Sequence, residues 1–149
     1  MPGSPDSKNG HAQVWVKVNA PVDRGLEPLI SALSAFPSLQ TLESCEGDAD
    51  RPAWVCFYYG SYWEQQWRGL ADFTLGFLGP ALIREVGDSA AVSIRVDACG
   101  IPRGELSVRP GMISAVTSAL ASLYHSWACS DGRSDTEPSD CSKHKPHQP

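Results

Sequence analysis

The sequence has no long apolar run and no pair of cysteines separated by two residues. No stretch approaches the roughly 18 apolar residues that a membrane-spanning helix needs, and residues 1–5 lack the charged and apolar segments of a secretion signal. The missing Cys-x-x-Cys spacing argues against a zinc ribbon. We therefore expect a soluble, cytoplasmic protein with no membrane contact and no metal site.

Positive charge is also scarce. Lysine and arginine total 12 against 17 aspartates and glutamates, which gives a net charge of -5. Because nucleic-acid-binding proteins usually carry a basic face that neutralises phosphates, this balance argues against a nucleic-acid partner. The five cysteines are odd in number and irregularly spaced, which favours reduced thiols over a disulfide framework.

Large apolar side chains are rare at both ends of the chain. Such segments cannot recover the entropy cost of ordering, so we expect a disordered arm over residues 1–12 and a disordered tail over residues 129–149. Cys141, His144 and His147 have metal-ligand chemistry but lie in that tail, and we predict no site there. Residues 13–128 are enough for a single domain with its own core.

Apolar periodicity predicts the elements of this domain. Period-two alternation indicates strands at 14–18, 92–97 and 105–109. A further strand is expected at 39–44, and the apolar residues on both faces of 53–59 indicate a central strand. Helical spacing indicates helices at 24–36 and 112–127, and a kinked or two-piece helix from 63 to 86 that Gly79-Pro80 interrupts. Asp23 is the expected N-cap of the first helix, Pro21 the end of the first strand, and residues 98–104 the loop of the last hairpin.

The predicted element order is β-α-β-β-α-β-β-α. Hairpins interleaved with helices favour an α+β two-layer sandwich, with a mixed, mainly antiparallel five-stranded sheet and helices on one face.

The strongest candidate site is the turn from Ser44 to Asp48, which follows a predicted strand. Backbone N–H groups of this turn would lower the pKa of the Cys45 thiol, whereas burial and the flanking Glu43 and Glu46 would raise it; we favour a structural thiol. Gly47 indicates a backbone with positive φ. His125 is the only histidine in the predicted domain and lies on a helix margin, so no catalytic residue is assigned.

Two further groups have alternative interpretations. Arg95 and Arg109 on the last hairpin either form ion pairs with carboxylates such as Glu105 or bind an anion together. Aromatic residues crowd the segment 54–67 and belong to the core, to a ligand pocket or to a protein interface. They are Trp54, Tyr58, Tyr59, Tyr62, Trp63 and Trp67.

The residues therefore favour a binding domain that takes a small molecule or a protein partner through the Ser44–Asp48 turn and the adjacent aromatic patch. Whether it is an enzyme is left open, and no cofactor is assigned. The expected ligand-binding residues are Ser44, Cys45, Glu46, Gly47, Arg95 and Arg109.

The segment 23–47 resembles the opening motif of the tRNA wybutosine-synthesising methyltransferase family, in which a helix and a Pro-containing turn lead into a strand ending in Ser-Ser-Cys-Ser-Gly-Arg. The resemblance implies S-adenosylmethionine as cofactor and a modified guanosine of tRNA as substrate, and this activity is our alternative function. The matching positions are Asp23, Leu26, Leu29, Ile30, Pro37, Thr41, Ser44, Cys45 and Gly47. This chain has Glu43 and Glu46 in place of serines and Asp48 in place of the arginine.

Overall fold

The computed structural model describes residues 13–15, 21–60 and 67–130. Within these ranges the fold is α+β, and its main sheet has four strands, all paired antiparallel, in the order β3-β4-β6-β5. The strands are β3 (Leu39–Cys45), β4 (Ala53–Tyr59), β5 (Ala90–Val96) and β6 (Pro102–Val108). A separate hairpin joins β1 (Gln13–Trp15) to β2 (Pro21–Asp23).

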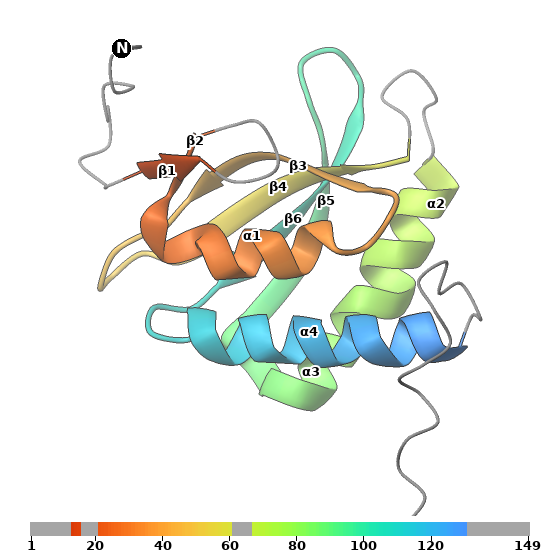
Figure 1. The fold of residues 1–149 in the computed structure, drawn as a ribbon. Helices are drawn as coiled ribbons and strands as arrows, with labels where there is room; N and C mark the ends of the chain where they lie inside the picture. The colour runs from red at the N-terminus through yellow and green to blue at the C-terminus, as the bar shows by residue number, and fades with distance from the viewer. Residues whose placement is uncertain (1–12, 16–20, 61–66, 131–149) are drawn as a thin grey trace, which may run out of the picture.

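The helices pack against the main sheet. The 3-10 turn η1 (Arg24–Leu26) leads into α1 (Glu27–Ser34), and α4 (Ile113–Ser130) lies beside α1 (Figure 1). Between β4 and β5 the chain forms α2 (Trp67–Ala71), the π-helical segment η2 (Asp72–Leu78), α3 (Gly79–Val86) and the 3-10 turn η3 (Gly87–Ser89). The predicted kinked or two-piece helix is, over the described residues, three consecutive helical segments, and Gly79-Pro80 lies at the junction of η2 and α3. Pro80 is in the first turn of α3, where its missing N–H costs little.

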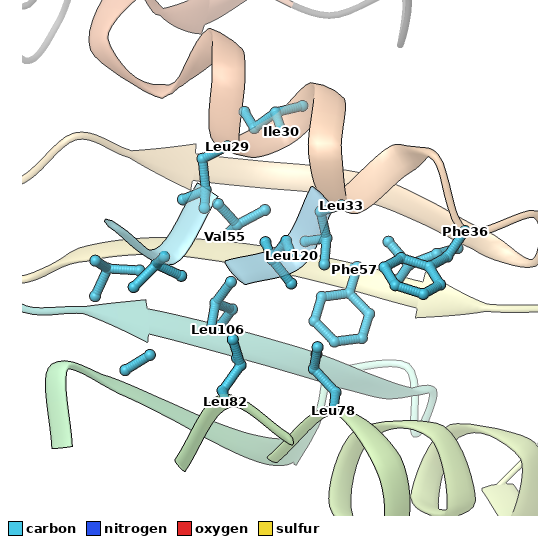
Figure 2. Packing of buried hydrophobic residues seen from close by; sticks show 14 of the residues in the cluster. Leu29, Ile30, Leu33, Phe36, Val55, Phe57, Leu78, Leu82, Leu106 and Leu120 are labelled. Carbon is cyan, nitrogen blue, oxygen red and sulfur yellow. The ribbon is translucent and has the colours of Figure 1, made fainter. Parts of the chain in front are cut away.

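One hydrophobic core fills the space between the helices and the sheet. Strand residues that share a face alternate with residues on the opposite face, so Val55 and Phe57 of β4 and Leu106 of β6 point to the same side and are fully buried. Figure 2 shows them meeting apolar side chains from the helices, among which are Leu29, Leu33, Leu78, Leu82 and Leu120.

The prediction of a mixed five-stranded sheet is wrong. The predicted first strand, 14–18, does not join the main sheet: Gln13–Trp15 pairs with Pro21–Asp23, and Trp15 lies opposite Pro21. Pro21 therefore begins a strand instead of ending one. The reason is that the chain reverses within a few residues, so the nearest pairing partner of β1 is local in sequence. Residues 16–18 of the predicted strand lie outside the described residues.

Asp23 occupies the predicted N-cap position, with an extended backbone just before η1, but the expected capping bond is absent. Its side chain makes no capping hydrogen bond to η1, which precedes α1. Its carboxylate Oδ2 instead accepts a hydrogen bond of 2.8 Å from the backbone N–H of Glu46. Asp23 is only 3% exposed, and a buried carboxylate needs a donor, so this bond between distant segments takes the place of the cap.

The last hairpin has a shorter loop than 98–104. β6 already begins at Pro102 and includes Gly104. The Asp97 side chain closes the loop by accepting 2.9 Å hydrogen bonds from the N–H groups of Cys99 and Ile101. Proline is tolerated at the first residue of a strand, and Gly104 is in the strand because the Phe57 ring lies over it. The arm 1–12 lies outside the described residues, as does the tail beyond Ser130, the last residue of α4.

Candidate functional site

The four-stranded sheet has a face turned away from the core, which we call the open face. It carries the strand residues that alternate with the core residues, and the described helices bury their apolar side chains on the other side. Register across the four strands sets one row of this face: Cys45 is opposite Trp54, Trp54 opposite Ser107, and Ser107 opposite Ala91. Directly opposite residues share a face, so Cys45 and Trp54 lie side by side there.

The turn predicted as the binding site starts at the end of β3 and divides between the two faces. Ser44 is opposite Val55 and so faces the core side, whereas Cys45 belongs to the open face and is half-buried. Glu46 donates its N–H to Asp23, and Gly47 is buried. Of the four predicted turn residues, the structure therefore places Cys45 beside the aromatic side chain of Trp54.

Gly47 confirms the predicted positive φ, at 70°. A Cβ on Gly47 would lie 2.4 Å from the backbone O of Arg51 and 2.7 Å from Pro52 atoms. Beyond it, the Asp48 carboxylate accepts from the N–H groups of Asp50 and Arg51, each at 2.9 Å, and from the Arg51 guanidinium. These hydrogen bonds lower the pKa of Asp48, and the largest effect comes from the Arg51 side chain. The turn is thus a tightly packed structural element.

We expect Gly47→Ala to lower the free energy of unfolding by about 1–3 kcal/mol, because alanine meets both a left-handed backbone and backbone atoms that cannot move aside. Gly100→Ala is the matched control: its φ is 80°, but a Cβ there has nothing within 4 Å. Urea unfolding of both variants gives the comparison. Equal losses in the two would show that only φ matters and that the packing at Gly47 contributes nothing.

The centre of the open face is occupied by Cys56, which the sequence patterns did not single out. The thiol is 4% exposed and donates a long hydrogen bond, 3.7 Å, to Glu105 Oε2. Arg95 on β5 lies 3.2 Å from the other carboxylate oxygen of Glu105. Arg103 on β6 lies 3.6 Å from the carboxylate of Glu43 on β3. Within each ion pair the two opposite charges neutralise each other beside the thiol. The period-two alternation of Trp54, Cys56 and Tyr58 was the signal that could have placed Cys56 on this face.

Burial, helped by the Glu105 carboxylate, raises the pKa of the Cys56 thiol from its ordinary value of 9.0 to about 11. A raised pKa means that folding favours the protonated thiol. Its contribution to stability is therefore fully present below pH 9.0 and is lost as the pH rises through about 11. At neutral pH Cys56 is a poor nucleophile.

We expect Cys56 to be alkylated by iodoacetamide much more slowly than the exposed Cys99, since two pKa units lower the thiolate fraction roughly 100-fold. Site-resolved mass spectrometry of the folded protein measures both rates. The Cys56 rate should climb with pH up to about 11. Glu105→Gln removes one cause of the shift and should speed the reaction. Comparable rates at Cys56 and Cys99 would contradict the assignment of a neutral, buried thiol.

The structure does not bring Arg95 and Arg109 together. Arg95 is opposite Arg103 near one end of the β5–β6 hairpin, while Arg109 follows β6 at its other end. Each has its own carboxylate: Arg109 lies 2.9 Å from Asp88, as Arg95 lies near Glu105. Their arrangement agrees with the ion-pair alternative for each arginine.

The aromatic patch is likewise divided. Trp54 and Tyr58 lie on the open face, where the Tyr58 hydroxyl donates to Asp97 Oδ2 at 3.1 Å. Tyr59 points to the core and stacks on Phe73 with ring centroids 5.0 Å apart. Trp67 lies on α2 and is 44% exposed. Tyr62 and Trp63 lie outside the described residues. Among the described residues of the patch, only Trp54 and Tyr58 therefore share a surface with Cys45.

His125, the one histidine among the described residues, lies on the exposed side of α4, where its Nε2 is 3.9 Å from the Cys129 thiol. Because α4 packs on the core side of the sheet, this thiol–imidazole pair is separated from Cys45, which lies on the open face. Within the same ranges no three His, Cys, Asp or Glu side chains are grouped to hold a metal ion. The open face presents aromatic rings and paired charges.

Comparison of the chain with protein-family models, with curated proteins and with solved structures finds no match in any of the three. Among the described helices, none is long and apolar enough to cross a membrane.

Proposed function

We propose that this protein is a binding domain whose ligand is another protein, recognised by the open face of the sheet at the end of β3. The observation that carries the proposal is the row formed by Cys45 and Trp54 across β3 and β4, on the face away from the core. This is the surface where the predicted turn and the predicted aromatic patch meet.

The residue types on this face support a protein partner. Tryptophan, tyrosine and arginine dominate the binding energy of protein interfaces, and the open face presents Trp54, Tyr58 and Arg95. Trp54 and Tyr58 are half-buried, so part of each ring is accessible, and Tyr58 is oriented by its bond to Asp97. Rigid aromatic side chains lose little entropy on binding.

The charges on the face support recognition over catalysis. Arg95 is paired with Glu105 and Arg103 with Glu43, and the Cys56 thiol between them is held protonated by its raised pKa. Charged groups in an interface set orientation and partner choice more than affinity. The small-molecule ligand that the sequence also allowed is the other outcome of the test.

The test places a photo-crosslinking amino acid at Trp54 and, as control, at Trp67 on α2, in the full chain expressed in its native cells. We expect a protein crosslinked from position 54 and not from position 67. With that protein purified, Trp54→Ala should weaken its binding by about 30-fold or more, while Trp67→Ala, a matched loss of an exposed ring, should change it little. Equal effects of the two substitutions would reject the open face as the binding surface.

The alternative function, an S-adenosylmethionine-dependent RNA-modifying enzyme of the wybutosine type, rests on the resemblance of the segment 23–47. Calorimetric titration with S-adenosylmethionine separates it from the binding domain. Micromolar binding would overturn the proposal of a non-catalytic domain, and no binding would remove the support for the alternative.

A further inference from the structure

The outer edge of β5 is a second surface with its own pattern. β5 is the last strand of the sheet, and no strand among the described residues pairs with its outer side. Its seven residues run in continuous register with β6, without a bulge, a proline or a lysine. At the opposite edge, β3 is interrupted by a bulge between Thr41 and Ser44 and is contacted by β2. Proteins usually protect a long, regular edge, so this one is suited to pairing.

The hydrogen-bonding groups of that edge can be assigned. Two hydrogen bonds flank β5: Arg109 N–H donates to Ser89 O at 2.9 Å, and Asp97 N–H donates to Ile101 O at 3.0 Å. They show that the odd-numbered residues of β5 are the ones whose backbone groups point toward β6. Along an antiparallel strand, residues that hydrogen-bond to the partner strand alternate with residues whose N–H and C=O groups point the other way. The N–H and C=O groups that point outward therefore belong to Ala90, Val92, Ile94 and Val96.

An apolar pocket of about 480 Å³ lies at the first end of the same edge. Leu82 and Ile83 of α3 line it together with Ala90 and Val92 of β5. Ile83 is 65% exposed. At the other end of β5, Val96 is 54% exposed and lies on the same side of the strand as Ala90 and Val92. The edge thus has an apolar pocket at one end and an exposed apolar side chain at the other.

We propose that the occupant of this edge is a second copy of the chain, paired antiparallel through β5 with a two-fold axis at Ser93. That register places Val96 of each copy opposite Ala90 of the other, beside the pocket, and Val92 opposite Ile94. These are the residues whose backbone groups point outward, so each pair exchanges both hydrogen bonds. The two four-stranded sheets become one continuous sheet, and the open face of each copy stays available.

The charges agree with this register. Arg95 is opposite Ala91 of the second copy, so the two arginines do not face each other, and Ser93 meets Ser93 at the axis. Like charges directly opposite would destabilise the pair. A two-fold interface requires one patch to be complementary to itself, and here the exposed valine and the pocket are equally far from the axis.

Sedimentation equilibrium of the full chain, with Val96→Asp as the interface variant, tests the proposal. We expect the wild type to reach twice the monomer mass as concentration rises, and Val96→Asp to raise the dissociation constant by about 30-fold or more, because the valine is lost and a charge enters an apolar pocket. Ala121→Asp, which adds the same charge on the exposed side of α4, should leave it unchanged. A monomeric wild type, or a dimer insensitive to Val96→Asp, overturns the proposal.

A crosslink tests the register independently of affinity. Residues at a non-hydrogen-bonded antiparallel pair have Cα atoms about 4.5 Å apart, within disulfide range, so the Ser93→Cys variant should form a disulfide between its two copies on mild oxidation. Ala91→Cys is the control on the same face: position 91 lies opposite position 95 of the second copy, which leaves the two introduced thiols about 13 Å apart and unable to bond. Peptide mapping identifies the bonded sites. A disulfide from Ala91→Cys but not from Ser93→Cys overturns the register.

Discussion

Phe36→Ala should remove about 3–5 kcal/mol from the free energy of unfolding, the cost of deleting a large buried ring. Phe36 is 1% exposed and follows α1 in the turn that leads to β3. Its ring meets four others edge-on: centroids lie 5.2 Å away for Phe73, 6.2 Å for Phe77, 5.5 Å for Tyr124 and 5.8 Å for Trp127. One ring thus joins three segments, so the cavity cannot close by moving a single element.

Urea unfolding measures the loss, and an unchanged m value shows that the same surface still unfolds. Phe36→Leu is the control, since it keeps an apolar side chain and most of the volume; we expect it to cost less than about half as much. A loss below about 1 kcal/mol for Phe36→Ala would mean that the aromatic cluster is loosely packed and that α4 is not held through it.

Gly104→Ala should destabilise the domain near the upper end of the range of about 1–3 kcal/mol for overpacking a core. The added Cβ would lie 2.3 Å from Cε2 and 2.4 Å from Cζ of Phe57, a fully buried ring on the neighbouring strand. Neither β4 nor β6 can move aside, because each is paired on both sides in the sheet. Thermal and urea unfolding measure the change.

Gly76→Ala is the control for that substitution. Gly76 is exposed on η2, has nothing within 4 Å of an added Cβ and does not have positive φ, so alanine there should be neutral or stabilising. A double-mutant cycle sharpens the test: Phe57→Leu should cost less in the Gly104→Ala background than in the wild type, because the smaller side chain relieves the clash. Additive effects would contradict the proposed contact between the ring and the strand.

Local sequence patterns predicted particular features of the candidate site. An ion pair with Glu105 was one of the two interpretations of Arg95, and glycine at position 47 indicated the positive φ that the turn has. What these patterns could not supply was the partner of each residue. Glu46 bonds Asp23 across 23 residues of sequence, and Cys56 meets Glu105 across 49. Such pairs depend on how strands are ordered and registered, which a single strand's alternation does not encode.

By itself, then, the sequence determined where most helices and strands of the described residues lie, because side-chain periodicity follows directly from local backbone geometry; it did not predict β2 or the start of β6 at Pro102. It also determined that β4 is central, since Ala53–Tyr59 has apolar residues on both faces. Only the tertiary structure decided that β1 pairs with β2 outside the main sheet, that β6 lies between β4 and β5, and that Cys45 meets Trp54. The physical reason is that strand pairing joins residues far apart in the chain, and its free energy comes from the packing of the whole core.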